Sequence, residues 1–190
     1  MAWPATAVAT NDPVTAAQLN GLPVMIANTT LGANAASIDF TSIPQHYAHL
    51  RIECYLRGDA AFSNRMGWVR LNGDATSQYD SQELYAGAAT PVSLEWITSA
   101  FIIIGRLAAS TAAANLFSAH KLTIPHYANS ANNKALISRS SMKTGTTTGL
   151  LQTAMSGGFW RSNAAITRVT ILPQSGNLVS GSRATLWGWP

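Results

Sequence analysis

The sequence predicts an all-β protein, an antiparallel β-sandwich of the jelly-roll type preceded by a short N-terminal arm. Three observations support this prediction. From residue 37 onward apolar residues recur with a period of two, which is the period of a half-buried strand. About ten such stretches follow one another, separated by turn-forming residues. No stretch is suited to the crossover helices that a parallel sheet requires.

The clearest strand covers residues 49–57. Leu50, Ile52 and Cys54 fall on one face of this strand, whereas Arg51 and Glu53 fall on the other. We therefore expect the first set to face the core and the second to face water.

The remaining strands are predicted from the same alternation, and turn residues separate them. They cover residues 37–40, 66–71, 77–85, 93–98, 101–107, 116–124, 134–140, 164–172 and 183–189. The predicted turns are Asn72-Gly73-Asp74, Pro91, Pro125, Asn132-Asn133, Gly157-Gly158 and residues 173–177.

Residues 1–36 differ from the sandwich domain, residues 37–190, and form the predicted arm. Thr15 and Gln18 have the spacing of a capping box, and Gly21 supplies a stop, so a short helix is expected. An isolated helix of about two turns is marginal in water and must dock to be ordered. Thr15, Gln18, Leu19 and Asn20 are therefore candidate attachment residues.

The charge distribution predicts contacts between distant parts of the chain. The formal net charge is +4, yet all eight acidic residues lie in the first half, and the second half carries only basic side chains. The basic residues are spread over many predicted strands and loops. Long-range ion pairs, within or between subunits, are the expected outcome, rather than specific nucleic-acid binding.

Composition excludes several classes of protein. Hydrophobic residues make up 47% of the chain and charged residues 11%, so disorder driven by charge is excluded. The strongest apolar run, residues 101–104, is far shorter than the roughly 18 residues of a membrane span, and Arg106 ends it. The start of the chain lacks the features of a secretory signal, so we expect no export through the Sec pathway. A single cysteine, Cys54, excludes an intrachain disulfide.

No motif for catalysis, a cofactor or a metal emerges, and we expect a protein that is not an enzyme. Strand alternation puts His49 and Cys54 on opposite faces, so they do not converge on a metal. The same argument separates Asp80 from Glu83, which disfavours the paired carboxylates of a glycosidase. A glycan depolymerase with carboxylates paired between subunits and a free carbohydrate-binding module stay open as alternatives.

Six tryptophans are more than a small core needs. Trp187 and Trp189 share one face of the last predicted strand, and with Trp160 they are candidates for an oligomer contact or a ligand contact. Ordinary packing between the two sheets is the alternative.

Several stretches in order along the chain resemble a group of tailed-bacteriophage virion proteins, described as tail-fibre-like, minor structural or head-decoration proteins. They are Thr15-Ala16-Ala17-Gln18-Leu19-Asn20, residues 38–52, Arg70-Leu71-Asn72-Gly73-Asp74, residues 79–82, residues 124–127, Asn133-Lys134, residues 160–167, Ser175-Gly176-Asn177 and Gly181-Ser182-Arg183.

The resemblance implies a non-enzymatic structural protein on the virion surface, made in the host cytoplasm. It would attach through its N-terminal arm as a capsid decoration or head fibre, with major capsid or tail proteins as partners. The alternative is a tail-fibre or tail-tip receptor-binding protein that recognises a host-surface glycan or protein. Proteins of this group are commonly homotrimers, and no cofactor or membrane insertion is implied.

Overall fold

A computed structural model describes residues 21–87 and 90–190, and it confirms the antiparallel β-sandwich. The strands are β1 (Val24–Thr30), β2 (Ile38–Phe40), β3 (His49–Leu56), β4 (Asn64–Leu71), β5 (Tyr79–Gly87), β6 (Pro91–Ser99), β7 (Ile102–Ala108), β8 (Ser118–Pro125), β9 (Lys134–Lys143), β10 (Leu151–Trp160), β11 (Val169–Pro173) and β12 (Arg183–Trp189).

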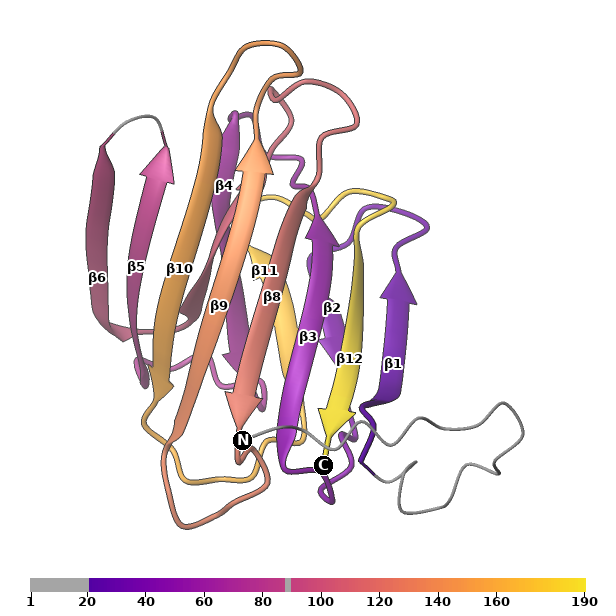
Figure 1. Cartoon of the computed structure of the whole chain (residues 1–190), viewed down its shortest axis with the longest axis vertical. Helices are drawn as coiled ribbons and strands as arrows, with labels where there is room; N and C mark the ends of the chain where they lie inside the picture. Colours follow the sequence, from indigo (N-terminus) through magenta and orange to yellow (C-terminus); the bar gives the residue numbers. More distant parts are fainter. Residues whose placement is uncertain (1–20, 88–89) are drawn as a thin grey trace, which may run out of the picture.

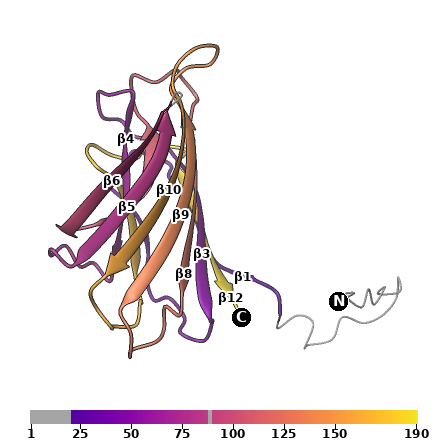
Figure 2. The ribbon, with the colours of Figure 1, turned by 60° about the vertical axis from the view of Figure 1, so that its left-hand side comes forward.

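The two sheets are unequal in width. One has eight strands in the order β1-β12-β3-β8-β9-β10-β5-β6, and the other has four in the order β2-β11-β4-β7. Figure 1 looks onto the eight-stranded sheet with the small sheet behind it, and Figure 2 shows the two layers from another side. The wide sheet therefore has one face on the core and one outer face.

The core lies between the sheets, as the period-two pattern predicts. Leu50, Ile52 and Leu56 of β3 are fully buried, and Leu122 and Ile124 of β8 lie beside them in the core. Their outward neighbours in each strand are polar or partly exposed. The alternation read from the sequence thus identifies the inner face of these strands correctly.

Two strands, β1 and β10, were not predicted from the sequence. β1 lies within the range predicted to be the arm, but Val24–Thr30 pairs with β12, so the large sheet begins before residue 37. The predicted turn at Gly157-Gly158 is wrong, because both glycines lie inside β10 and pair with β9 and β5. The strand predicted over residues 164–172 is shorter and begins at Val169. The predicted helix over residues 15–20 lies outside the described residues.

The ion pairs predicted from the charge distribution are confirmed. Three join a basic residue of the second half to an acidic residue of the first. They are Arg106 with Glu83 (3.1 Å), Arg161 with Asp80 (2.6 Å) and Arg168 with Asp39 (2.6 Å).

Strand β7 approaches the eight-stranded sheet unusually closely. A Cβ added at Gly105, which has a φ of 106°, would overlap the Ser140 side chain. A Cβ added at Gly158 would overlap Ile102. Only glycine fits at either contact.

A polar layer fills the narrow space beneath β7. Ser138, Ser140 and Ser156 face inward and are buried, and the Ile104 carbonyl accepts hydrogen bonds from Ser138 Oγ (2.8 Å) and from the ring of His120 (3.1 Å to Nδ1). His120 is only 3% exposed. Burial lowers the pKa of His120 to about 4.

We expect Gly158→Ala to destabilise the fold by about 1–3 kcal/mol, because the new methyl group must push Ile102 away. Gly157→Ala is the matched control, since a Cβ there meets nothing within 4 Å. Urea unfolding of both variants measures the difference. Equal stability of the two variants would contradict the close approach of β7.

The lowered pKa of buried His120 predicts that the protein loses stability in mild acid. The unfolded chain binds a proton near pH 6.5, whereas folded His120 stays neutral down to about pH 4. The free energy of unfolding therefore falls as the pH drops through this window, by at most about 1.4 kcal/mol per pH unit from this group. His120→Gln should flatten the slope, and His46→Gln, at an exposed position, serves as control. An unchanged slope in His120→Gln would refute this assignment.

Candidate functional site

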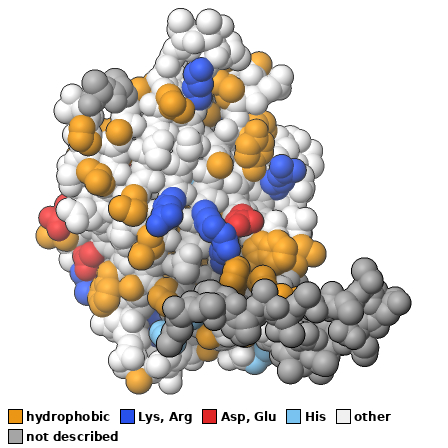
Figure 3. All heavy atoms as spheres, in the orientation of Figure 1, with side chains coloured by type: hydrophobic (Ala, Val, Ile, Leu, Met, Phe, Trp, Pro, Cys, Tyr) orange, Lys and Arg blue, Asp and Glu red, His pale blue; other side chains and the backbone are white. Residues whose placement is uncertain are grey.

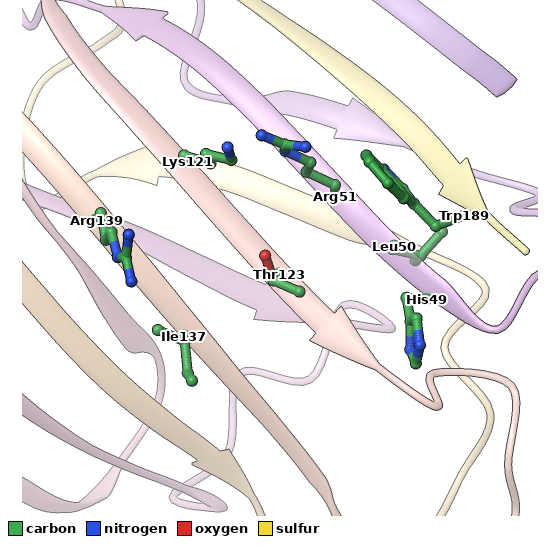
Figure 4. A pocket seen from close by; sticks show the side chains of 8 residues that line it. All are labelled: His49, Leu50, Arg51, Lys121, Thr123, Ile137, Arg139 and Trp189. Atoms are coloured by element: carbon green, nitrogen blue, oxygen red, sulfur yellow. The ribbon is translucent and has the colours of Figure 1, made fainter. Parts of the chain in front are cut away.

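The outer face of the eight-stranded sheet carries a shallow groove of about 450 Å³. Strands β12, β3, β8 and β9 contribute its walls, and its surface is mostly apolar. The residues that line it, shown in Figure 4, are His49, Leu50, Arg51, Lys121, Thr123, Ile137, Arg139 and Trp189. Its volume lies within the range of roughly 300–1,000 Å³ typical of small-molecule sites.

Strand alternation and register bring the basic side chains together. Arg51 and Glu53 face outward from β3, Lys121 from β8 and Arg139 from β9. In the register of the sheet, Glu53 lies opposite Lys121, and Lys121 lies opposite Arg139. Residues far apart in the sequence therefore form one row across three strands.

The groove is electropositive. Arg51 Nε lies 3.2 Å from Glu53 Oε1, and the Glu53 side chain is half exposed. The groove thus combines three cationic side chains with one adjacent carboxylate. Figure 3 shows basic side chains gathered at the centre of this face, next to an acidic group and hydrophobic side chains.

Aromatic rings form one end of the groove. The Arg51 guanidinium lies 5.3 Å from the centroid of the Trp189 ring, a cation–π contact, and Figure 4 shows the two side chains next to each other. His49 meets His126 edge to face, with 5.2 Å between ring centroids. Within the part of the chain that the structure describes, the indole N–H groups of Trp187 and Trp189 have no hydrogen-bond partner.

The tryptophan predictions have different outcomes. Trp187 and Trp189 do share a face, the outer face of β12, and Trp189 lines the groove. The prediction that Trp160 makes an oligomer or ligand contact is wrong. Trp160 is only 3% exposed, its ring stacks on Tyr79, and its Nε1 donates a hydrogen bond to Asp74 Oδ2 (2.8 Å). Its side chain belongs to the core and cannot make a surface contact.

The candidate attachment residues Thr15, Gln18, Leu19 and Asn20 lie outside the described residues. Sequence reasoning missed the groove residues Arg51, Lys121 and Arg139 as a set. Their outward positions could be read from each strand, but the register that places Lys121 beside both Glu53 and Arg139 could not.

The carboxylates considered for catalysis are separated. Glu83 is buried and pairs with Arg106, whereas Asp80 faces the other way and pairs with Arg161. Burial raises the pKa of Glu83 despite the neighbouring Arg106. Their positions on opposite faces agree with the sequence prediction.

Neither a cluster of metal-ligating side chains nor a long apolar helix is found among the described residues. Over residues 21–87 and 90–190, no three His, Cys, Asp or Glu side chains are grouped so as to hold a metal ion. Cys54 is buried, which raises the pKa of its thiol. In the same ranges no helix has the length and apolar character needed to cross a membrane.

Comparison with known proteins finds no related sequence and a distant structural likeness. No protein-family model matches the sequence, and no curated protein sequence matches it. Among solved structures, the crystal structure of galectin LEC-6 from Caenorhabditis elegans is similar, with a TM-score of 0.34 and 10% sequence identity. The alignment covers 84% of this chain and 94% of the galectin chain.

Proposed function

We propose that the protein is a non-enzymatic structural component of a tailed-phage virion surface, a capsid decoration or head fibre that attaches through its N-terminal segment. The observation that carries this proposal is an apolar surface at the start of the sandwich. Leu22, Val24 and Met25 are all exposed, and Met25 is 55% exposed. They directly follow the predicted attachment residues in the chain.

The position of β1 in the sheet supports the same role. β1 is the terminal strand of the eight-stranded sheet, so one edge of its backbone is paired with no other described strand. An open strand edge with apolar side chains is a ready template for contact with another chain. A coat subunit is the partner that fits a decoration protein, and such binding would stabilise the shell by mass action.

Deletion of residues 1–20 should leave the sandwich folded but abolish its co-sedimentation with phage particles. In the full chain, Val24→Lys together with Met25→Lys should weaken particle binding, whereas Ile97→Lys, at an exposed apolar position on the opposite edge strand, should not. Immunogold labelling of intact particles should place the protein on the head. Absence of label would refute a virion role, and unimpaired binding by the truncated chain would refute attachment through the arm.

A second candidate function is receptor recognition as a tail-fibre or tail-tip protein. The groove favours it, because a mostly apolar surface with a basic rim on an outer sheet face is suited to a host-surface ligand. Immunogold label at the tail tip instead of the head would select this function.

We also propose a homotrimer, in which an uncharged apolar strip on the outer face is covered by another copy. The strip consists of Leu84 on β5 and Leu151, Met155 and Phe159 on β10. Residues close to a threefold axis meet their own copies, so an axis that runs beside an uncharged strip avoids the repulsion that the basic groove would cause there.

Sedimentation should give a particle of three times the chain mass of 20.1 kDa at micromolar concentration. Leu84→Lys combined with Met155→Glu, two residues directly opposite each other, should yield monomers that remain folded, because the new charges are of opposite sign. Ala119→Lys adds the same type of charge on the same face outside the strip and should leave the trimer intact. A wild-type monomer would refute the trimer.

A further inference from the structure

We propose that the groove on the outer face is a binding site for a carboxylate-bearing sugar of an acidic glycan. Arg51, Lys121 and Arg139 would bind the carboxylate, and Trp189 would contact the apolar face of the sugar ring. This inference takes its biological setting from the second candidate function, receptor recognition, but its chemistry depends on the groove alone.

The charge arrangement is the first argument. Lys121 and Arg139 lie directly opposite each other on neighbouring strands, and like charges at such positions destabilise a sheet. Arg51 lies one position further along the same face and adds a third cation, while Glu53 is the carboxylate beside them. Glu53, opposite Lys121, is one carboxylate for three cations, so the row keeps an excess of positive charge, which is expected where function requires it. An anionic ligand would convert the repulsion into attraction.

The surface between the charges is the second argument. Ile137 is 58% exposed, and Trp189 forms the opposite end of the groove. A sugar acid matches this surface, because its ring has an apolar face of C–H groups and its edge carries hydroxyls and a carboxylate.

The arginines match a carboxylate in shape. A guanidinium donates two parallel hydrogen bonds to the two oxygens of a planar carboxylate, with a geometry that a lysine does not reproduce. Arg51 and Arg139 face the groove from different strands, and Figure 4 shows both side chains extending along the surface with Lys121 between their strands.

A polyanion such as nucleic acid fits less well. Binding along a phosphate backbone needs a continuous track of basic groups. Elsewhere in the described chain, Arg106, Arg161 and Arg168 are held in ion pairs, and Lys134 donates to three backbone carbonyls. These four basic residues are therefore engaged within the protein, and the groove is a local cluster of cations rather than part of a continuous path for a phosphate backbone.

The test is calorimetric titration of the full-length protein with oligosaccharides that contain glucuronic or sialic acid. The matched probes are the same oligosaccharides with the carboxylate reduced to an alcohol. The acidic forms should bind and the reduced forms should bind at least tenfold more weakly. Equal binding of the two forms, or no binding of either at millimolar concentration, would overturn the proposal.

Variants locate the site. Arg51→Gln, Arg139→Gln and Trp189→Ala should each weaken binding at least tenfold. Arg183→Gln is the matched control, because Arg183 lies on the outer face of β12 but does not line the groove, so removing the same charge there should change affinity less than twofold. A similar loss in the control would indicate general charge attraction and refute a local site.

Lys121→Gln separates binding from folding. This variant should lose affinity while its thermal midpoint stays close to that of the wild type, because the unfavourable contact with Arg139 and the favourable contact with Glu53 are removed together. If duplex DNA or inorganic phosphate displaces the acidic sugar at comparable concentrations, the groove is a general anion site and the sugar assignment is wrong.

Failure of this proposal is distinguishable from failure of the proposed function. Binding is measured on the purified protein, whereas virion location is measured on particles. Tail-tip label without sugar binding would leave receptor recognition standing with a different ligand. Sugar binding without any particle label would leave the groove assignment standing in a free binding protein.

Discussion

The close approach of β7 to the eight-stranded sheet is the constraint on which the rest of the sandwich depends. Because Gly105 and Gly158 have no side chain, β7 can lie almost against β9 and β10. The inward residues nearest β7 must then be small, and they include Ser138, Ser140 and Ala154. Serine hydroxyls and the His120 ring need partners in the interior, and the Ile104 carbonyl accepts from both. Packing distance thus limits the size of the side chains in this part of the core.

Beside this contact, the outer face of the sheet differs from that of an ordinary amphipathic sheet, because the alternation of polar and apolar residues is inverted in β10. On β10 the polar residues Gln152 and Ser156 point inward, and the apolar residues Leu151 and Met155 point outward. Under β3 and β8 the usual order holds, with leucine and isoleucine inside. The outer face therefore has an apolar part over β10 and a basic, aromatic part over β3, β8 and β12. Two surfaces with different chemistry are presented on one rigid support.

The sequence predicts most of the sandwich, and the misses have physical causes. The strand at His49–Leu56 follows the expected alternation because it covers the apolar part of the core. β10 was missed because its polar residues face inward, so its alternation is inverted, and because Gly157-Gly158 resembles a turn. β1 was missed because an edge strand that is buried little carries little alternation. The groove could not be predicted, since the register between Lys121 and Arg139 depends on the whole sheet.

The ion pairs give the clearest reason to regard the groove as functional. The acidic residues of the first half are matched in space with basic residues of the second half at Glu83, Asp80 and Asp39. The buried pair, Arg106 with Glu83, is the most demanding of these, because an unpaired charge in the interior destabilises a fold strongly. Folding therefore accounts for Arg106, Arg161 and Arg168. Lys121 has Glu53 opposite it as well, but Arg139 lies between Lys121 and Met155 and has no carboxylate opposite it on either neighbouring strand. The groove therefore keeps an excess of positive charge that the proposed acidic ligand would neutralise.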